Sequence, residues 1–295
     1  MALRATSAIM LAAAFALSVA GCRGSGAGSV AGGARPTATA TVTEPAANAG
    51  TATSPSTFSP GPVTEVCGPP NAPGRLTTIR ASDGVRLAAI EVGSGERGVV
   101  LIPELGAAGK CGWWDYAAYL ASRGFRVVLF DHRCTGESSC PPSGTAPAGL
   151  TSDIQGAVIR LRQQGATAIA LLGASQGGAE ALIAATLPQR GLTGVAALSA
   201  DELSTSLAAD PYPATALAAA ARLRLPVLFA VAKGDPYVSV QQTRQLYQEA
   251  GSRHKQLVIL GPEQGHGWDL VTAQPDGLRP IFSRTLVAFL RTVTS

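Results

Sequence analysis

From residue 76 to the C-terminus, the sequence alternates between short apolar runs and segments whose apolar residues recur at helical spacing. The apolar runs predict strands at 76–81, 85–92, 99–102, 125–130, 168–172, 194–198, 227–231 and 256–260. The intervening segments predict helices at 113–122, 153–164, 178–187, 214–223, 240–250 and 281–292. Strands that alternate with helices form a mostly parallel sheet with helices on both faces, so the fold class is α/β. The first two strands flank Ser82-Asp83-Gly84, a tight-turn sequence, and add an antiparallel hairpin at one edge.

One serine follows an expected strand in a sequence typical of a nucleophile. Gly173-Ala174-Ser175-Gln176-Gly177 lies between the strand at 168–172 and the helix at 178–187. A sharp strand-to-helix turn presents the serine hydroxyl at the edge of the sheet, and side chains at the two glycine positions would clash there. The alternative interpretations are a helix N-cap and a phosphate-binding turn.

A serine hydroxyl needs a base, and the chain has an acid and a histidine in the required order. Asp235 follows the strand at 227–231, and His266 lies in a glycine-bracketed loop after the last strand. Because the carboxyl ends of parallel strands meet at one edge, we expect Ser175, Asp235 and His266 to lie together as nucleophile, acid and base. Asp201, after the preceding strand, is the alternative acid.

These positions resemble the catalytic residues of the α/β-hydrolase superfamily, and the resemblance covers nearly all of residues 76–295. Residues 130–138 (FDHRCTGES) are similar to the loop that follows the fourth strand of that family. The resemblance implies an esterase-like serine hydrolase that needs no cofactor and no metal. It also implies that the backbone amides of Leu105 and Gln176 form the oxyanion hole.

The loop after the third strand departs from the family pattern. The family commonly has His-Gly there, whereas this chain has Pro103-Glu104. Backbone amides do not depend on side-chain identity, so the oxyanion hole is retained. Glu104 nevertheless brings a carboxylate near a site that must stabilise developing negative charge, which favours a slow enzyme or an unusual substrate.

The remaining histidines and the tryptophans have structural interpretations. His254 precedes the last strand, at the end of the sheet away from the site, and is expected on the surface. His132 lies close to the active edge, where a structural role is the favoured interpretation. Trp113, Trp114 and Trp268 are expected to fill the core or a rim rather than to contact substrate.

The N-terminus has the features of an export signal. Residues 1–21 contain Arg4 and a twelve-residue apolar stretch from Ala8 to Val19, which is too short to span a bilayer. The sequence that ends at Cys22 resembles a bacterial lipobox, so we expect acyl chains on Cys22 and a lipid-anchored protein on the extracytoplasmic face of the cell membrane; an ordinary signal peptide is the alternative. Residues 22–62 are rich in Gly, Ala, Thr and Pro, and predict a disordered linker to a domain at 63–295.

Four cysteines remain after Cys22, which suggests two disulfides in an exported domain. They are Cys67, Cys111, Cys134 and Cys140, and three pairings are possible. We favour Cys67–Cys111 with Cys134–Cys140, because the second pair closes a short loop.

The composition and the loop lengths limit the kinds of partner and substrate that we expect. A net charge of +4 without a basic cluster argues against nucleic acid, and we expect a monomer that acts on a small-molecule or lipid ester. The segment between the strands at 194–198 and 227–231 is too short for the large cap domain of many family members, so the site is expected to be open. A peptidase or amidase, and a non-catalytic binding protein with the same fold, are the alternatives.

Overall fold

The computed structural model describes residues 63–142, 149–201 and 215–295. The expected signal peptide (1–21), Cys22 and the linker (22–62) lie outside these residues. Within the three described stretches, no helix is both long enough and apolar enough to cross a bilayer.

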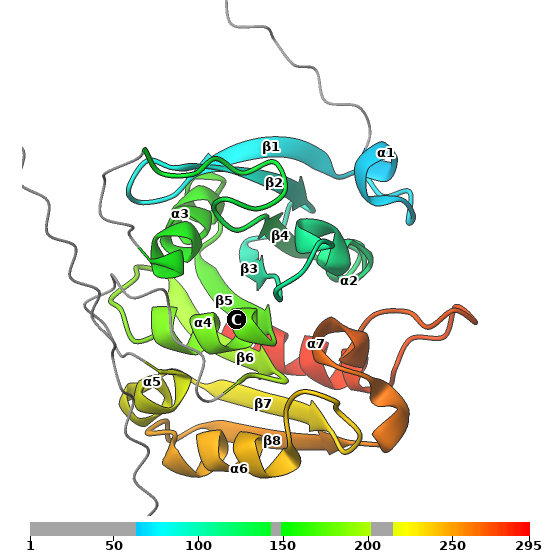
Figure 1. Ribbon diagram of the computed structural model, residues 1–295. Helices are drawn as coiled ribbons and strands as arrows, with labels where there is room; N and C mark the ends of the chain where they lie inside the picture. The colour runs from blue at the N-terminus through cyan, green and yellow to red at the C-terminus, as the bar shows by residue number, and fades with distance from the viewer. Residues whose placement is uncertain (1–62, 143–148, 202–214) are drawn as a thin grey trace, which may run out of the picture. The chain divides into compact units, whose positions relative to one another are not determined.

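Among the described residues, eight strands form one sheet in the order β1-β2-β4-β3-β5-β6-β7-β8 (Figure 1). β2 pairs antiparallel with both β1 and β4, and every other pairing is parallel, which confirms the predicted sheet and its antiparallel edge hairpin. The strands are β1 (Arg75–Arg80), β2 (Arg86–Val92), β3 (Arg97–Ile102), β4 (Phe125–Phe130), β5 (Ala168–Ala174), β6 (Leu192–Leu198), β7 (Val227–Ala232) and β8 (Lys255–Leu260).

Helices cover both faces of the sheet (Figure 1). They are α1 (Val63–Cys67), α2 (Trp114–Ala121), α3 (Leu150–Gln163), α4 (Gln176–Ala184), α5 (Ala216–Arg222), α6 (Val240–Glu249) and α7 (Phe282–Val293), with 3-10 turns η1 (Gly109–Trp113), η2 (Pro262–Gln264) and η3 (Gly267–Leu270). Val100 and Ile102 of β3 belong to the core under α3 to α6, whereas Val99 and Leu101 belong to the core under α2 and α7. Adjacent residues of one strand thus face two different cores, which explains why β3 is apolar throughout.

Some boundaries differ from the prediction. α3 begins at Leu150, three residues early, because Leu150 is itself buried and extends the apolar face. α4 begins at Gln176, directly after Ser175, although Gly177 and Gly178 are poor helix formers. The short helix α1 was not predicted. In the described part of the connection between β6 and β7, α5 is the only helix, and no large cap domain is seen there.

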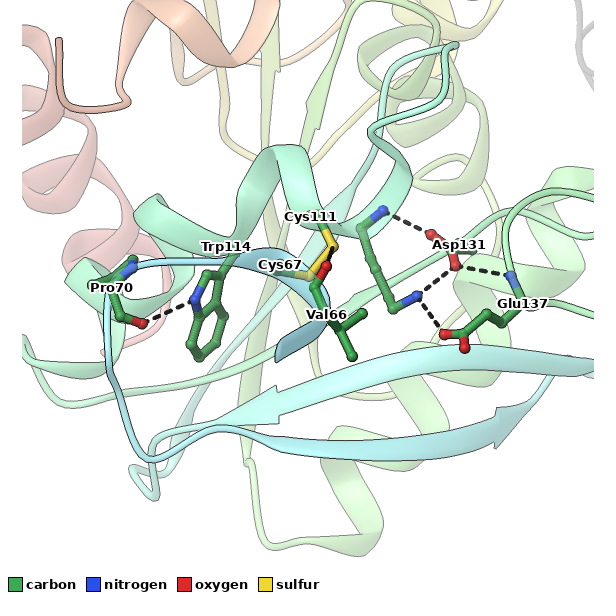
Figure 2. Close-up of a disulfide and its surroundings, with 8 residues drawn as sticks. Val66, Cys67, Pro70, Cys111, Trp114, Asp131 and Glu137 are labelled. Carbon is green, nitrogen blue, oxygen red and sulfur yellow. Dashed lines mark hydrogen bonds and ion pairs between the residues drawn. A yellow bond between two sulfur atoms is a disulfide. The ribbon is translucent and has the colours of Figure 1, made fainter. Parts of the chain in front are cut away.

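Two disulfides join the expected cysteines. Cys67 bonds to Cys111 and ties α1 to η1, and Cys134 bonds to Cys140 within the loop after β4. Figure 2 shows the first disulfide beside the Trp114 indole, whose Nε1 donates to the Pro70 carbonyl at 3.1 Å. The pairing is the one favoured from the sequence.

We predict that the two disulfides stabilise the fold unequally. The first closes a loop of sequence separation 44 and the second one of 6. The chain-entropy model of the unfolded state then gives about 4 kcal/mol for the first disulfide and about 2 kcal/mol for the second. Urea unfolding of the Cys67→Ser/Cys111→Ser and Cys134→Ser/Cys140→Ser variants measures both losses. A larger loss from the second pair would contradict the prediction.

Candidate active site

The loops that carry Ser175 and His266 both contact the carboxyl end of β6. The Ser175 amide donates to the Leu198 carbonyl at 2.8 Å, and the Gly267 amide donates to Ser199 Oγ at 3.0 Å. Asp235 follows β7, and its side chain reaches the same place by bonding to His266. The structure therefore brings Ser175, Asp235 and His266 to one edge of the sheet.

Close backbone contacts on either side of Ser175 leave no room for side chains at the neighbouring glycine positions. Ser175 has φ 52° and ψ −122°, a conformation that non-glycine residues rarely adopt. A Cβ atom on Gly173 would lie 2.0 Å from the Gly177 carbonyl oxygen, and one on Gly177 would lie 2.3 Å from the Pro103 carbonyl oxygen. Only glycine fits at these two positions. The Ser175 side chain makes no capping hydrogen bond to α4, so the N-cap interpretation does not describe it.

His266 and Asp235 form a close, shielded pair. His266 Nδ1 lies 2.9 Å from each carboxylate oxygen of Asp235, whose side chain is 0% exposed. The amides of Tyr237 and Val238 donate to Asp235 Oδ1 at 2.9 Å and fix the carboxylate. Because a carboxylate accepts, Nδ1 carries the hydrogen, and Nε2 of a neutral His266 is free to act as a base. The imidazole bonds to Asp235 rather than to Asp201, the alternative acid.

Ser199 is a site residue that the sequence analysis missed. It is fully buried directly after β6, and its φ of 47° turns the chain. Its Oγ accepts from the Gly267 amide at 3.0 Å, and its hydroxyl helps to lower the pKa of Asp235. Ser199 thus joins the acid to the loop of His266. The only signal in the sequence is its place after a strand that ends at the active edge.

Glu104 lies against the opposite side of the imidazole. Its Oε1 accepts from the Trp268 amide at 3.1 Å, and its Oε2 lies 3.8 Å from His266 Nε2. Within the described residues, no hydrogen bond joins Ser175 Oγ to His266. Catalytic hydrogen bonds are often long in ligand-free structures and tighten when substrate binds.

Two backbone amides are available at the positions expected for the oxyanion hole. β3 and β5 are parallel neighbours with Ile102 opposite Gly173, so the segments that lead to Leu105 and to Gln176 leave the sheet side by side. Among the described residues, neither the Leu105 amide nor the Gln176 amide donates a hydrogen bond within the protein. Unsatisfied amides at the start of a helix and in a neighbouring loop suit an incoming anionic oxygen.

The tryptophans and the other two histidines lie in the core, at its rim or on the surface, as a structural role predicts. Trp113 and Trp114 are buried in the core, and Trp268 is half-buried with its ring 6.1 Å from that of Trp113. His254 is exposed before β8. His132 is buried next to α4. In residues 63–142, 149–201 and 215–295, no group of acidic residues, histidines and cysteines is arranged to hold a metal ion.

Comparison with known proteins agrees with this topology. A family model described as alpha/beta hydrolase fold matches residues 98–218. An esterase from Pyrococcus furiosus superimposes with a TM-score of 0.60 at 15% identity, over 75% of this chain and 93% of the esterase. The chain has the α/β-hydrolase fold.

Two further solved structures are similar to this chain. An esterase from Exiguobacterium antarcticum has a TM-score of 0.54 at 20% identity, over 73% of this chain and 99% of that chain. A monoacylglycerol lipase from Paleococcus ferrophilus has a TM-score of 0.53 at 18% identity, over 70% of this chain and 98% of that chain. No curated protein matches the sequence significantly. At these identities the likeness establishes the fold alone.

Charges around His266 change the pKa values of the site. Burial alone would lower the pKa of His266, but the hydrogen bond and charge of Asp235 raise it, and Glu104 and Asp269 add to the rise. Burial raises the pKa of Glu104. Burial would also raise the pKa of Asp235, but hydrogen bonds from His266, Ser199 and backbone amides outweigh burial and lower this pKa.

These shifts predict how activity depends on pH. A histidine base must be neutral, so activity should fall as the pH drops through the raised pKa of His266, above its ordinary 6.5. Glu104→Gln removes a negative charge that stabilises the imidazolium, so the acid limb of the kcat/KM profile should move to lower pH. Glu263, in the loop of His266, has an exposed carboxylate and serves as the control. Glu263→Gln should leave the acid limb of the profile in place. An unmoved limb in Glu104→Gln would show that Glu104 does not act on His266.

Proposed function

We propose that the protein is a serine hydrolase that cleaves carboxylic esters through an acyl-enzyme intermediate. Ser175 is the nucleophile, His266 the general base, and Asp235 the acid that orients His266. The Leu105 and Gln176 amides stabilise the oxyanion.

One observation carries this proposal. His266 Nδ1 is hydrogen-bonded at 2.9 Å to a carboxylate that is 0% exposed, and its loop meets the end of β6 where the strained turn of Ser175 also bonds. A buried Asp–His pair next to a serine in an enforced turn is the arrangement that activates a hydroxyl nucleophile.

The proposed reaction has two acyl-transfer steps. Ser175 Oγ attacks the carbonyl carbon while His266 Nε2 takes the hydroxyl proton, and the carbonyl oxygen becomes an oxyanion held by the two amides. Collapse of this intermediate expels the alcohol, which receives the proton from His266. Water then attacks the acyl-enzyme with His266 again as the base, and the carboxylic acid leaves Ser175.

The substrate class is inferred from the fold and from the open site. The compared proteins are named esterases and a monoacylglycerol lipase, which favours esters over amides. Leu105 and Tyr237 are 68% and 76% exposed beside the site and offer apolar contact to an acyl chain or alcohol. A connection between β6 and β7 whose described part holds only the short helix α5 suits short acyl esters, or larger substrates presented at a surface.

Ester hydrolysis is tested with p-nitrophenyl acetate, butyrate and octanoate, with the matching p-nitroanilides as amide controls. We expect turnover of the esters, and a loss of at least about 10³-fold in kcat for Ser175→Ala because the acyl-enzyme cannot form. A fluorophosphonate probe should label the wild type and not Ser175→Ala. Turnover of only the anilides would make the protein an amidase. Neither turnover nor labelling would leave a binding protein with the same fold.

We also propose that the protein is held to the outer face of the cell membrane by acyl chains on Cys22. Each buried methylene contributes about 0.8 kcal/mol to such anchoring. Expression with labelled palmitate should place the label in the wild type and in Cys67→Ser, with both proteins in the membrane fraction. Cys22→Ser should carry no label and leave that fraction. Labelled Cys22→Ser would contradict the proposal.

A further inference from the structure

A buried histidine and a buried glutamate lie beneath the candidate site and take no part in the proposed proton transfers. His132 follows β4 and Glu180 lies in α4, with side chains 7% and 1% exposed. His132 Nε2 lies 3.5 Å from Glu180 Oε2. Burying polar side chains has a desolvation cost, so stability is a weak reason for the pair to exist.

The pair is also incompletely hydrogen-bonded. Within the described residues, His132 Nδ1 and Glu180 Oε2 have no hydrogen-bond partner, and the His132 ring packs edge-on against Phe130 with 5.7 Å between centroids. Buried polar atoms without partners are rare in native proteins, and each calls for an explanation.

His132 binds the segment that leads to the first oxyanion amide. Its Nε2 lies 3.2 Å from the Pro103 carbonyl oxygen. Because a carbonyl only accepts, Nε2 carries the hydrogen and donates it to Pro103. Pro103 stands two residues before Leu105, and its carbonyl is also the group that leaves no room for a side chain at Gly177.

Glu180 binds the residue that carries the second oxyanion amide. Gln176 Nε2 donates to Glu180 Oε1 at 2.7 Å, one helical turn further along α4. Gln176 is the first residue of α4, directly after Ser175. Its side chain is therefore held against α4, while its backbone amide makes no hydrogen bond to the described residues.

The backbone around His132 is itself anchored on both sides. Lys110 Nζ bonds to Asp131 at 2.7 Å, and Arg133 Nη2 bonds to Asp153 at 2.6 Å. Figure 2 shows the Asp131 carboxylate, which also accepts from the Glu137 amide. The donor on His132 is thus held in a fixed place rather than on a loose loop.

We propose that His132 and Glu180 are positioning residues that set the distance and orientation between the Leu105 and Gln176 amides of the oxyanion hole. The pair joins the two segments through one chain of contacts: Pro103 carbonyl, His132, Glu180 and the Gln176 side chain. This inference rests on the proposed function, because it assigns a support to the oxyanion hole of that reaction.

The expected effect falls on the transition state. An oxyanion hole works because its donors are aligned before charge develops, and loss of one donor costs about 10² to 10³ in kcat. Loss of a support misaligns donors without removing them. Ground-state binding of the ester depends little on this alignment, so KM should change little.

The test uses Glu180→Leu and His132→Phe in the full chain, with a p-nitrophenyl ester as substrate and an alkyl boronic acid as inhibitor. Boron forms a bond to Ser175 Oγ, whose proton passes to His266, and the boron becomes a tetrahedral anion. The affinity of the boronic acid therefore reports the oxyanion hole. Each variant should lower kcat by about 10- to 100-fold and weaken boronic acid inhibition by a similar factor. The double variant should lose no more than the worse single variant, because the two residues act as a unit.

Two kinds of control separate positioning from general destabilisation. His132→Gln keeps an N–H donor for the Pro103 carbonyl, and Glu180→Gln keeps an acceptor for Gln176; both should retain more activity than the apolar variants. Val158→Ala, a core truncation in α3, should lower Tm without changing boronic acid affinity. If an apolar variant does not fold, the two glutamine variants serve as the test of the positioning role. They should still bind the boronic acid more weakly than the wild type does.

The outcomes distinguish this inference from the proposed function. If the wild type hydrolyses esters while every His132 and Glu180 variant keeps its kcat and boronic acid affinity within about twofold, only the positioning proposal is wrong. If the variants lose affinity in proportion to Tm, as Val158→Ala also does, the pair is structural and the proposal is again wrong. If the wild type neither hydrolyses esters nor binds the boronic acid, the proposed function fails and this inference fails with it.

Discussion

The close approach of backbone to backbone at Gly177 is the constraint on which the candidate site depends. A side chain there would overlap the Pro103 carbonyl, so the start of α4 sits directly against the segment that leaves β3. This contact brings an amide of each segment to the same edge, next to Ser175 with its positive φ. The cost of that conformation is offset by the surrounding sheet, in which β3 and β5 are buried and hydrogen-bonded along their length.

The electrostatics of the site favour a positive charge on His266. Asp235, Glu104 and Asp269 all raise its pKa, and the Asp235 carboxylate is shielded from water. Such an environment would stabilise the imidazolium that the proposed acyl transfer requires. It also works against an oxyanion, since Glu104 adds negative charge on the side of Nε2. Well-aligned amide donors matter more in a site of this kind than in one without the extra carboxylate.

The sequence predicted elements whose signal is local. The apolar run from Phe125 to Phe130 matches β4 at both ends, and the Asp-Gly turn gave the antiparallel edge. The meeting of Asp235 with His266 followed from the rule that parallel strands end at one edge. Ser199 was missed because its role depends on a positive φ and on a contact with Gly267, 68 residues further along the chain, neither of which a serine after a strand reveals. The direction of the Glu104 side chain likewise depends on the fold of the loop around Trp268.

The Cys67–Cys111 disulfide also has a mechanical consequence. β1, β2 and β3 all lie inside the loop that this bond closes. A load applied to the chain at Val63 is carried by covalent bonds from Cys67 to Cys111 and reaches η1 and α2 without passing through the edge hairpin. The antiparallel pairing of β1 with β2, which would otherwise open one hydrogen bond at a time, is therefore outside the path of the force. A protein pulled from its N-terminal side would transmit tension to the buried start of α2 and leave the edge of the sheet intact.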